Sequence, residues 1–479
     1  MDSLVELVTD VNDAYWYAVI VLLVGLGLYF TVRSRFVQIR LLPDMLRSVT
    51  EPAETLPDGE KGISAFRAFS ISAASRVGTG NIAGVAIAIS VGGPGAVFWM
   101  WVMALIGAAT AFVESTLAQV YKIRDKDGGF RGGPAYYMLH GLRRRWMGVI
   151  FAVIITVTYG FVFNAVQTNS IVDAVSTSVG EDSRALSIVV GLVVAGLTAA
   201  VIFGGVRRIS AVSQVVVPVV AGAYLVIALI VVVLNITEVP GMIRLVVENA
   251  FGIREVVSGG FAAAFMQGIR RGLFSNEAGM GSAPNAGATA AVSHPVKQGL
   301  VQSLGVYFDT LLVCTATAFI ILLNPDYGTK AGASLTQNAL SAQLGGWTVH
   351  FLTFAIFFLA FTSVIGNYYY GESNIEFLTG SRRVLQGFRA IVVVCVFAGA
   401  VGSLPLIWAL ADLVMGVMAT VNLAALLPLS GVAFLLFGHY RRQRAEGKDP
   451  TFHRDEVPEI SGIQVWDEAP EDGRISTHG

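Results

Sequence analysis

Long apolar runs alternate with short polar stretches along most of this chain. A run of about 20 apolar residues can cross a hydrocarbon core of about 30 Å as a helix. The pattern predicts eleven such spans and an all-α integral membrane protein. The spans cover residues 14–32, 66–91, 95–121, 147–177, 185–204, 210–235, 257–293, 299–323, 347–377, 388–403 and 405–437.

Two of these spans are interrupted by glycines and small polar residues, at 78–81 (GTGN) and at 272–279 (GLFSNEAG). Irregular backbone at membrane depth occurs only where protein or a water-filled cavity receives it. Paired interruptions in two halves of a chain indicate the substrate and ion site of a secondary transporter. Each interrupted span opens a set of five, and because five is odd the second set enters from the opposite side. The pattern therefore predicts an inverted repeat.

The composition agrees with a membrane protein, because 54% of the residues are hydrophobic and 14% are charged, against about 25% charged in soluble domains. The net charge of -1 and the confinement of basic residues to loops argue against nucleic-acid binding. Cys314 and Cys395 both lie inside apolar runs, so we expect them to be packing residues rather than a disulfide or a metal site.

Basic residues gather on one side of the eleven-span arrangement. They lie in the stretches 33–47, 122–145, 207–208, 382–389 and 441–444, whereas the opposite loops mix basic with acidic residues. Cytoplasmic loops of membrane proteins carry an excess of Lys and Arg. We therefore expect a multi-pass protein of the plasma membrane with its N-terminus outside and its C-terminus in the cytoplasm.

This reading divides the chain into an N-terminal helix with a cytoplasmic loop, a first five-helix repeat, an extracellular connection, a second five-helix repeat and a cytoplasmic tail. The respective residues are 1–65, 66–235, 236–256, 257–437 and 438–479. From Arg441 to Gly479 the tail mixes charge with Pro and Gly and has no sustained apolar period, which predicts a disordered or loosely held extension.

Several motifs carry a family resemblance. They are GTGNIAG at 78–84, GGPGAVFWMW at 92–101, GGPAYY at 132–137, NAVQ at 164–167 and RGLFSNEAGMGSAP at 271–284. Together they resemble the alanine or glycine:cation symporter family over nearly the whole chain apart from the tail. The resemblance implies a leucine-transporter-like fold with a five-plus-five inverted repeat and an extra N-terminal helix. It also implies uptake of small neutral amino acids, chiefly alanine and glycine, with sodium as the coupling ion and no cofactor.

A zwitterionic amino acid inside a membrane needs a partner for each of its two charges. The outer half of span 66–91 begins near Gly80, where free amides can receive the carboxylate. The first half of span 257–293 ends near residues 271–274, where free carbonyls can receive the ammonium group. The expected substrate contacts are Gly78, Thr79, Gly80, Asn81, Gln167, Gly272, Phe274, Ser275 and Asn276.

Two of these residues have an alternative role. Phe274 fits simple helix packing as well as an apolar lid over the substrate. Gln167 fits an interhelical hydrogen bond as well as a ligand contact.

Sodium prefers oxygen ligands, and the inner half of span 66–91 ends with loose carbonyls near Ala74 and Val77. Thr362 and Ser363, midway along span 347–377, resemble the Thr-Ser pair that completes the sodium site of leucine-transporter-like proteins. The alternative is that both hydroxyls bond back to carbonyls of their own helix.

Charged residues within membrane spans need partners. We expect Arg76 to pair with Glu277 and Arg271 (or Arg270) to pair with Asp412, as static ion pairs that hold the fold together. The alternative is that the first pair forms an inner gate and the second an outer gate. We treat Glu114 and Asp309 as structural candidates.

Other classes of function fit less well. The chain has no HExxH or GxSxG motif and its six histidines are scattered, which argues against an enzyme. A channel usually lines a continuous pore by assembling subunits, whereas this chain carries its own internal pseudo-symmetry. A proton-coupled permease of the same fold, with a carboxylate such as Glu277 coupling transport, remains an open alternative.

Overall fold

The computed structural model describes residues 2–56, 59, 61–125, 128–253, 260–324 and 332–466. The regular secondary structure of this part of the chain is helical apart from one short hairpin and two isolated bridges. In the hairpin, β1 (Ile123–Arg124) pairs antiparallel with β2 (Phe130–Arg131).

The first half of the chain contains a long N-terminal helix, a helix pair broken at the first interruption, and four long helices. Its helices are α1 (Asp2–Arg33), α2 (Val37–Arg40), α3 (Leu42–Thr50), α4 (Ala65–Arg76), the π-helix η1 (Gly80–Gly84), α5 (Val85–Gly92), α6 (Gly95–Val120), α7 (Pro134–His140), α8 (Arg145–Val157), the π-helix η2 (Thr158–Val162), α9 (Phe163–Val179), α10 (Arg184–Ile202) and α11 (Gly205–Leu234).

The second half repeats the theme of a broken helix followed by long ones. Its helices are α12 (Val239–Ala250), α13 (Gly260–Asn276), α14 (Ala283–Gly287), α15 (Pro295–Val306), the π-helix η3 (Tyr307–Cys314), α16 (Thr315–Leu322), α17 (Ala333–Leu344), α18 (Trp347–Leu378), α19 (Arg382–Val401), α20 (Leu404–Ala445) and the 3-10 helix η4 (Arg454–Glu456).

Nine helices in the described ranges are long and apolar enough to cross a membrane, or ten if α4 and the η1–α5 segment count as one span bent by 51°. The predicted span 257–293 corresponds to α13, which has 17 residues, and to the short α14, with non-helical residues between them. The protein is thus a multi-pass helical membrane protein. The predicted count of eleven includes this second broken segment.

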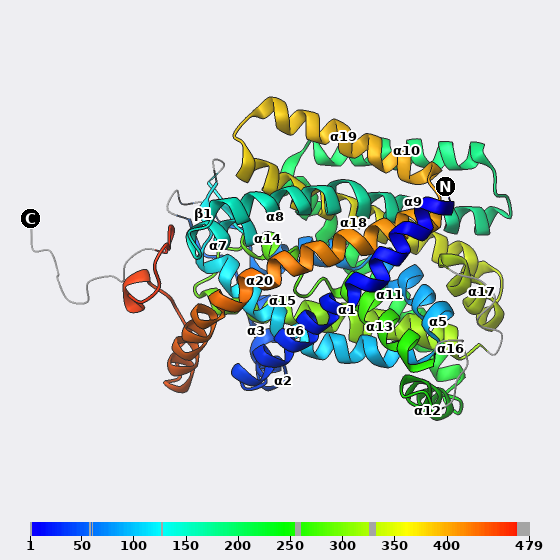
Figure 1. Cartoon of the computed structure of the whole chain (residues 1–479), viewed down its shortest axis with the longest axis horizontal. Coiled ribbons are helices and arrows are strands. Elements are labelled where there is room, and N and C mark those ends of the chain that lie inside the picture. Colours follow the sequence, from blue (N-terminus) through cyan, green and yellow to red (C-terminus); the bar gives the residue numbers. More distant parts are fainter. Residues whose placement is uncertain are drawn as a thin grey trace, which may run out of the picture.

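The helices run between two ends of the molecule (Figure 1). The N-terminus, α12 and α17 lie at one end, which we call the α17 end. The hairpin, α2, α7 and the last turns of α20 lie at the other, which we call the α7 end. Helices α1 and α20 run side by side along much of this length, and α10 packs against α19 at one edge.

Small residues let the first half of the second broken segment approach its neighbour closely. A Cβ atom on Gly268 of α13 would lie 2.5 Å from the Ala96 carbonyl oxygen of α6. A Cβ on Gly272 would lie 3.3 Å from the Cβ of Met103, also on α6. Helices in membranes associate through such small-residue contacts. The packing fixes α13 against α6 and so positions the second break.

The segment after α20 is packed against the α7 end, so the prediction of a disordered or loose tail is wrong for residues 441–466. Phe452, Val457, Ile460 and Trp466 are each less than 9% exposed. The Phe452 amide donates to the Ser293 carbonyl at 2.9 Å. The four apolar side chains have no regular spacing in the sequence, and Phe452 and Trp466 pack against each other with ring centroids 5.3 Å apart. Residues 467–479 of the predicted tail lie outside the described residues.

Candidate functional site

The first break joins α4 to η1, and side chains cap its free amides. The Gly78 amide donates to Asn81 Oδ1 at 2.9 Å, and the Thr79 amide donates to Gln167 Oε1 at 3.1 Å. Gln167 comes from α9, so it makes an interhelical hydrogen bond here. These two amides precede those expected to be free for a carboxylate, which begin near Gly80; of the latter, the Asn81 amide donates to the Gly78 carbonyl at 3.3 Å.

The second break begins later than predicted. Helix α13 continues to Asn276, and the Glu277 amide still donates to the Leu273 carbonyl at 2.9 Å. The expectation of unpaired carbonyls from residue 271 onward is wrong; the free carbonyls follow Leu273. Glu277, Gly279 and Gly281 then take left-handed backbone with φ of 58°, 92° and 81°. Gly272 faces α6, so a substrate contact from its Cα is not supported.

A buried hydrogen-bond network joins the two breaks. Asn81 Nδ2 donates to Asp309 Oδ1 at 2.6 Å and to Ser275 Oγ at 3.1 Å. The Ser275 and Thr310 hydroxyls donate to Asp309 Oδ2 at 2.7 and 2.8 Å. Cys314 Sγ lies 3.0 Å from Ser275 Oγ. The network thus ties η1, α13 and η3 together at one point.

Three members of this network were not among the predicted site residues. Asp309 was treated as structural, Cys314 as a packing residue, and Thr310 was not considered; all three lie on the π-helix η3. Short π-helical segments within α-helices often occur at functional sites. A signal was present for Asp309, because it is the one charged residue in the apolar run 299–323.

Aromatic rings cover the first break. A Cβ atom built on Gly80 would lie 3.0 Å from the ring of Phe274, so this glycine lets the ring approach the backbone. The Phe274 ring centroid lies 4.7 Å from that of Phe163 and 4.9 Å from that of Trp408. Phe163 and Trp408 were missed by the sequence reasoning because nothing marks them within apolar runs.

Several buried polar atoms near these breaks have no hydrogen-bond partner among the described residues, including atoms of Arg76 and Arg271. Three others are Thr79 Oγ1, Asn276 Nδ2 and Trp408 Nε1. Buried polar groups almost always find a partner, so each exception needs an explanation. All three belong to segments that meet at the breaks, where a polar ligand would supply partners.

The candidate sodium residues are brought together in part. Ser363 Oγ donates to the Ala74 carbonyl at 2.8 Å, which joins α18 to the end of α4. A Cβ on Gly78 would lie 2.2 Å from Ser363 Oγ, so this close approach requires glycine. Val77 caps α4 beside them. Both hydroxyls also lie within hydrogen-bond distance of the Leu359 carbonyl of their own helix, Thr362 at 2.9 Å and Ser363 at 3.0 Å, as the alternative reading expected.

The expected outer ion pair is formed. Arg271 of α13 contacts both carboxylate oxygens of Asp412 on α20, with side-chain exposures of 3% and 10%. The Arg271 guanidinium carbon lies 4.9 Å from the Trp408 ring centroid. Neighbouring Arg270 pairs with Asp13 of α1 at 2.9 Å.

The expected inner ion pair is not formed, so that prediction is wrong for this conformation. Arg76 Nη1 donates to the Gln302 carbonyl at 3.4 Å on α15. Glu277 accepts hydrogen bonds from Ser75 and Ser282, each at 2.7 Å. The left-handed backbone at Glu277 directs its carboxylate to these hydroxyls, which sequence spacing does not reveal.

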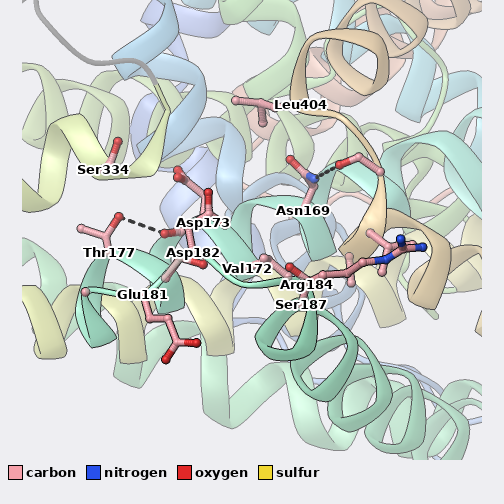
Figure 2. Close-up of a pocket in the computed structure, with 15 residues that line it drawn as sticks. Asn169, Val172, Asp173, Thr177, Glu181, Asp182, Arg184, Ser187, Ser334 and Leu404 are labelled. Carbon is pink, nitrogen blue, oxygen red and sulfur yellow. Dashed lines mark hydrogen bonds between the residues drawn. The ribbon is translucent and has the colours of Figure 1, made fainter. Parts of the chain in front are cut away.

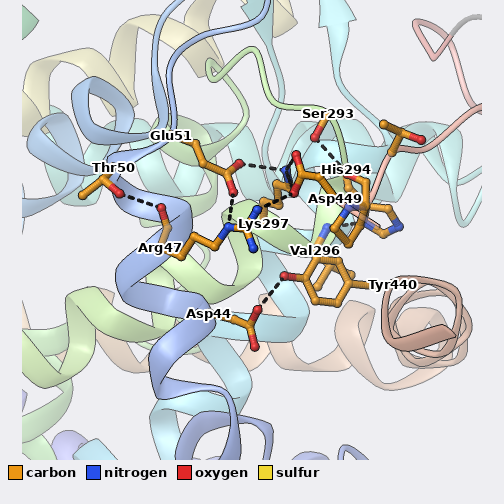
Figure 3. Close-up of polar contacts among 12 residues, drawn as sticks. Asp44, Arg47, Thr50, Glu51, Ser293, His294, Val296, Lys297, Tyr440 and Asp449 are labelled. Atoms are coloured by element: carbon orange, nitrogen blue, oxygen red, sulfur yellow. Dashed lines mark hydrogen bonds and ion pairs between the residues drawn. The ribbon is translucent and has the colours of Figure 1, made fainter. Parts of the chain in front are cut away.

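A different ionic cluster lies at the α7 end (Figure 3). Lys297 is 2% exposed at its side chain and pairs with Glu51 at 2.8 Å and with Asp449 at 3.0 Å. Arg47 lies 3.5 Å from Asp449. We call these four residues the Lys297 cluster. Burial lowers the pKa of the adjacent His294 well below its usual value, and His439 and Lys297 lower it further.

A cavity of about 970 Å³ opens among α9, α10, α17, the end of α19 and the start of α20 (Figure 2). Asp173, Glu181, Asp182 and Arg184 are among the residues that line it. Asp173 Oδ2 accepts from the Ala333 amide at 3.1 Å. None of the predicted substrate or sodium residues lines this cavity, so it lies apart from the breaks.

The fold and the paired breaks together define a secondary transporter of the leucine-transporter-like class. A structure of MhsT in complex with L-phenylalanine matches 79% of this chain and 98% of its own, with a TM-score of 0.54 and 12% identity. A mutant manganese transporter of Eremococcus coleocola matches 84% and 85%, with a TM-score of 0.50 and 15% identity. At these identities the likeness shows the fold alone.

The sodium:alanine symporter family model matches residues 1–454. AlsT, an amino-acid carrier protein of Bacillus subtilis (strain 168), is 51% identical over 463 residues, which is 97% of this chain and 98% of the relative. The probable sodium/glutamine symporter GlnT of the same organism is 48% identical over 482 residues, covering 100% and 99%. The sodium/alanine symporter AgcS of Methanococcus maripaludis is 39% identical over 445 residues, covering 89% and 95%.

This chain therefore belongs to the sodium:alanine symporter family. It is a sodium-coupled amino acid symporter and not an enzyme, as the resemblance in its motifs implied.

Proposed function

We propose that this protein takes up small neutral amino acids, chiefly alanine and glycine, together with sodium by alternating access. The network of Asn81, Ser275 and Asp309 carries the proposal, because it places both helix breaks around one buried point. Free backbone groups at two breaks can serve the two opposite charges of an amino acid.

In the proposed site the carboxylate binds at the amides of the first break. It would join or replace the side-chain partners that Asn81 and Gln167 now supply. The ammonium group binds at the free carbonyls of Phe274 to Asn276. The unpartnered Thr79 hydroxyl and Asn276 amide supply further contacts.

The small size of the substrate follows from the position of Phe274. Its ring lies against Gly80 and is held by Phe163 and Trp408, so little room remains beside the break. Overpacking a close-fitting site costs about 1 to 3 kcal/mol. Alanine and glycine should therefore bind, and larger side chains should be disfavoured.

We further propose eleven membrane spans in two inverted repeats, residues 66–235 and 257–437, with the α7 end in the cytoplasm of a plasma-membrane protein. The broken segments α4–η1–α5 and α13–α14 each open one repeat. The basic stretches around Arg33, Arg382 and Arg441 support this orientation through the positive-inside rule.

The sodium site is proposed at the carbonyls of Ala74 and Val77 with the hydroxyls of Thr362 and Ser363. The direct contact between Ser363 and the Ala74 carbonyl supports it. Replacing both hydroxyl residues by Ala should raise the sodium concentration for half-maximal uptake about tenfold or more, since hydrogen bonds to charged groups are worth about 1.5 to 3 kcal/mol. Ser363→Ala alone should act more strongly than Thr362→Ala.

The matched control is Thr348→Ala, which removes a hydroxyl of the same helix that bonds the Gly345 carbonyl. Uptake is measured in proteoliposomes over a range of sodium concentrations. An unchanged sodium dependence in the double variant would refute this site.

The substrate is tested by competition against alanine binding to purified protein. Glycine should compete well; leucine, phenylalanine and glutamine should compete poorly. Asn81→Leu should abolish binding, and because it also removes the cap of the Gly78 amide and the donor to Asp309, thermal unfolding checks that the variant is still folded; Phe274→Ala should admit leucine. Glutamine competing as well as alanine would contradict the small-substrate site, and one relative is named for glutamine.

One contact favours proton coupling as a second candidate. The Ser75 hydroxyl lies 2.7 Å from both Glu277 Oε1 and Asn367 Oδ1. A hydroxyl has one hydrogen to donate, so both contacts are satisfied when Glu277 carries a proton. Glu277→Gln should leave sodium-driven uptake intact if sodium alone couples transport, and should abolish proton-driven uptake if Glu277 carries the coupling proton.

A further inference from the structure

A groove lies between the last turns of α1 and of α20, away from the helix breaks. It encloses about 380 Å³. Its lining consists of Arg33, Ser34, Arg35, Gly431, Phe434, Leu435, Phe437, Gly438 and Arg441. Three arginines and three large apolar side chains therefore share one small cavity.

The three arginines are not neutralised by the protein. Arg33, Arg35 and Arg441 are exposed and make no ion pair with any residue in the described ranges. Two of them lie over aromatic rings, with Arg33 5.7 Å from the Phe434 centroid and Arg441 5.8 Å from the Phe437 centroid. These contacts hold the guanidinium groups beside the groove while leaving their donors available.

The floor of the groove is made by two glycines of α20. Gly431 and Gly438 are seven residues apart and so lie on the same face of the helix. A Cβ atom at either position would meet no atom within 4 Å, so neither glycine is required by packing. A glycine inside a helix costs about 1 kcal/mol relative to alanine. What these residues provide is open space beneath the arginines.

The turn after α1 adds a second unusual feature. Arg35 and Phe36 are consecutive non-glycine residues in left-handed backbone, with φ of 55° and 59°. A non-glycine residue in this conformation raises the backbone energy by about 1 to 2 kcal/mol. The turn places Arg33 and Arg35 on either side of buried Ser34 at the mouth of the groove.

The depth of the groove matches the boundary of the membrane. The apolar runs that predict the first and last spans end at residues 32 and 437, next to Arg33 and Gly438. Leu435 in the wall is 43% exposed, and Val32 beside the groove is 65% exposed. The groove therefore has a charged mouth at head-group depth and an apolar wall that continues into the lipid-facing surface.

We propose that this groove binds the head group of an anionic phospholipid, with its phosphate held by Arg33, Arg35 and Arg441 and its acyl chains lying along the apolar wall. Arginine binds phosphate oxygens through paired hydrogen bonds, and basic pockets between membrane helices bind anionic lipids. A soluble phosphate would gain nothing from the aromatic and aliphatic wall. The assignment of the lipid to the cytoplasmic leaflet rests on the proposed orientation. The proposal that the groove binds the lipid does not depend on that orientation.

The test is native mass spectrometry of the purified full-length protein with phosphatidylglycerol or phosphatidylcholine added, in the absence of sodium and alanine. The parent should retain phosphatidylglycerol in preference to phosphatidylcholine. Each basic residue near a lipid surface contributes about 1 kcal/mol, or about fivefold in affinity. The affinity of the triple variant Arg33→Gln, Arg35→Gln, Arg441→Gln for phosphatidylglycerol should therefore be about a hundredfold lower than that of the parent.

Gly438→Leu fills part of the groove without changing its charge, and an added Cβ there meets no protein atom within 4 Å. The affinity for phosphatidylglycerol should fall about tenfold, since overpacking a site costs about 1 to 3 kcal/mol. The matched control Arg382→Gln with Arg383→Gln removes two exposed arginines at the start of α19 and should keep the parent's affinity. Thermal unfolding confirms that each variant is folded.

Equal retention of the two lipids, equal loss in the triple and control variants, or displacement of the lipid by millimolar inorganic phosphate would overturn the proposal. Because the assay contains neither substrate nor coupling ion, its outcome is independent of the proposed transport function.

Discussion

The two ends of the molecule hold their helices together with ionic contacts of different kinds. Toward the α17 end, Arg271 and Asp412 form a one-to-one pair between two membrane helices, α13 and α20, at 3% and 10% exposure. At the α7 end, Lys297 is 2% exposed, but its partners Glu51 and Asp449 are 21% and 52% exposed. They lie outside the membrane helices, in the loop after α3 and in the tail.

The difference in exposure predicts a difference in the free-energy cost of separating the charged partners. Separating a buried pair leaves charges without water, whereas separating a partly exposed pair lets water replace the partner. Trp408 stacks over Arg271, and Trp16 donates to the Asp412 carbonyl at 3.2 Å, which further shields the pair. We therefore expect the contacts of the Lys297 cluster to separate at a lower free-energy cost than the Arg271–Asp412 pair.

The largest effect is expected from Asp412→Asn. It leaves the Arg271 guanidinium buried without a counter-charge, and breaking a buried pair in this way costs about 3 to 5 kcal/mol. The unfolding temperature of the purified protein should fall strongly, and uptake should fall with it.

Its matched control is Asp13→Asn, which removes the partner of the neighbouring Arg270. Asp13 is 61% exposed at its side chain, and Arg270, which is 5% exposed, keeps its hydrogen bond to the Asn12 carbonyl at 3.2 Å, so this change should cost less than Asp412→Asn, about 1 to 2 kcal/mol. If the two variants lowered the unfolding temperature equally, the comparison between buried and partly exposed ion pairs would be wrong.

A smaller effect is expected from Lys297→Met, which removes the cation of the Lys297 cluster and keeps its apolar stem. The carboxylates of Glu51 and Asp449 remain in contact with water, so the loss should be about 1 to 2 kcal/mol. Opening at the α7 end should become more frequent. The rate at which a cysteine introduced at Ser293 is labelled measures how often this end opens. Slower labelling in the Lys297→Met variant than in the parent with the same cysteine would contradict this prediction.

The smallest effect concerns pH. The pKa of His294 is lower in the folded protein than in the unfolded chain, so both states are neutral well above about pH 6.5. As the pH falls below that value, the unfolded chain binds a proton first and the folded state loses stability. Between about pH 7.5 and about pH 5.5 this histidine should account for about 1 kcal/mol.

His294→Asn removes the titration but keeps an oxygen able to cap the Val296 amide, which His294 Nδ1 now does at 3.1 Å. The unfolding temperature should then depend less on pH. The control is His350→Asn, which replaces an exposed histidine at the α17 end. If both variants changed the pH dependence of the unfolding temperature equally, His294 would not be its cause.

The positions of the membrane spans and of the first break were predictable from the sequence. Apolar length decides which segments enter a bilayer, and glycines such as Gly78 and Gly80 mark where a helix cannot continue undisturbed. The Arg271–Asp412 contact was also predictable, because buried charges require partners and few are available.

The end of the second broken helix was not predictable. Residues 271–276 remain helical because packing against α6 supports them, and local composition carries no information on that neighbour. The partners of Arg76 and Glu277 depend in turn on where this helix ends. For the same reason the sequence suggested a loose tail, although Phe452 and Trp466 are buried against loops far away in the chain.

The sequence by itself determined that this chain crosses a membrane many times and breaks helices at paired glycine-rich segments, since hydrophobic length and backbone freedom are local properties. Only the tertiary structure decided which side chains meet at those breaks. Asp309 and Trp408 reach them, and Ser363 reaches the Ala74 carbonyl while its neighbour Thr362 does not. These contacts depend on the rotation of each helix about its axis, which is set by packing against the others.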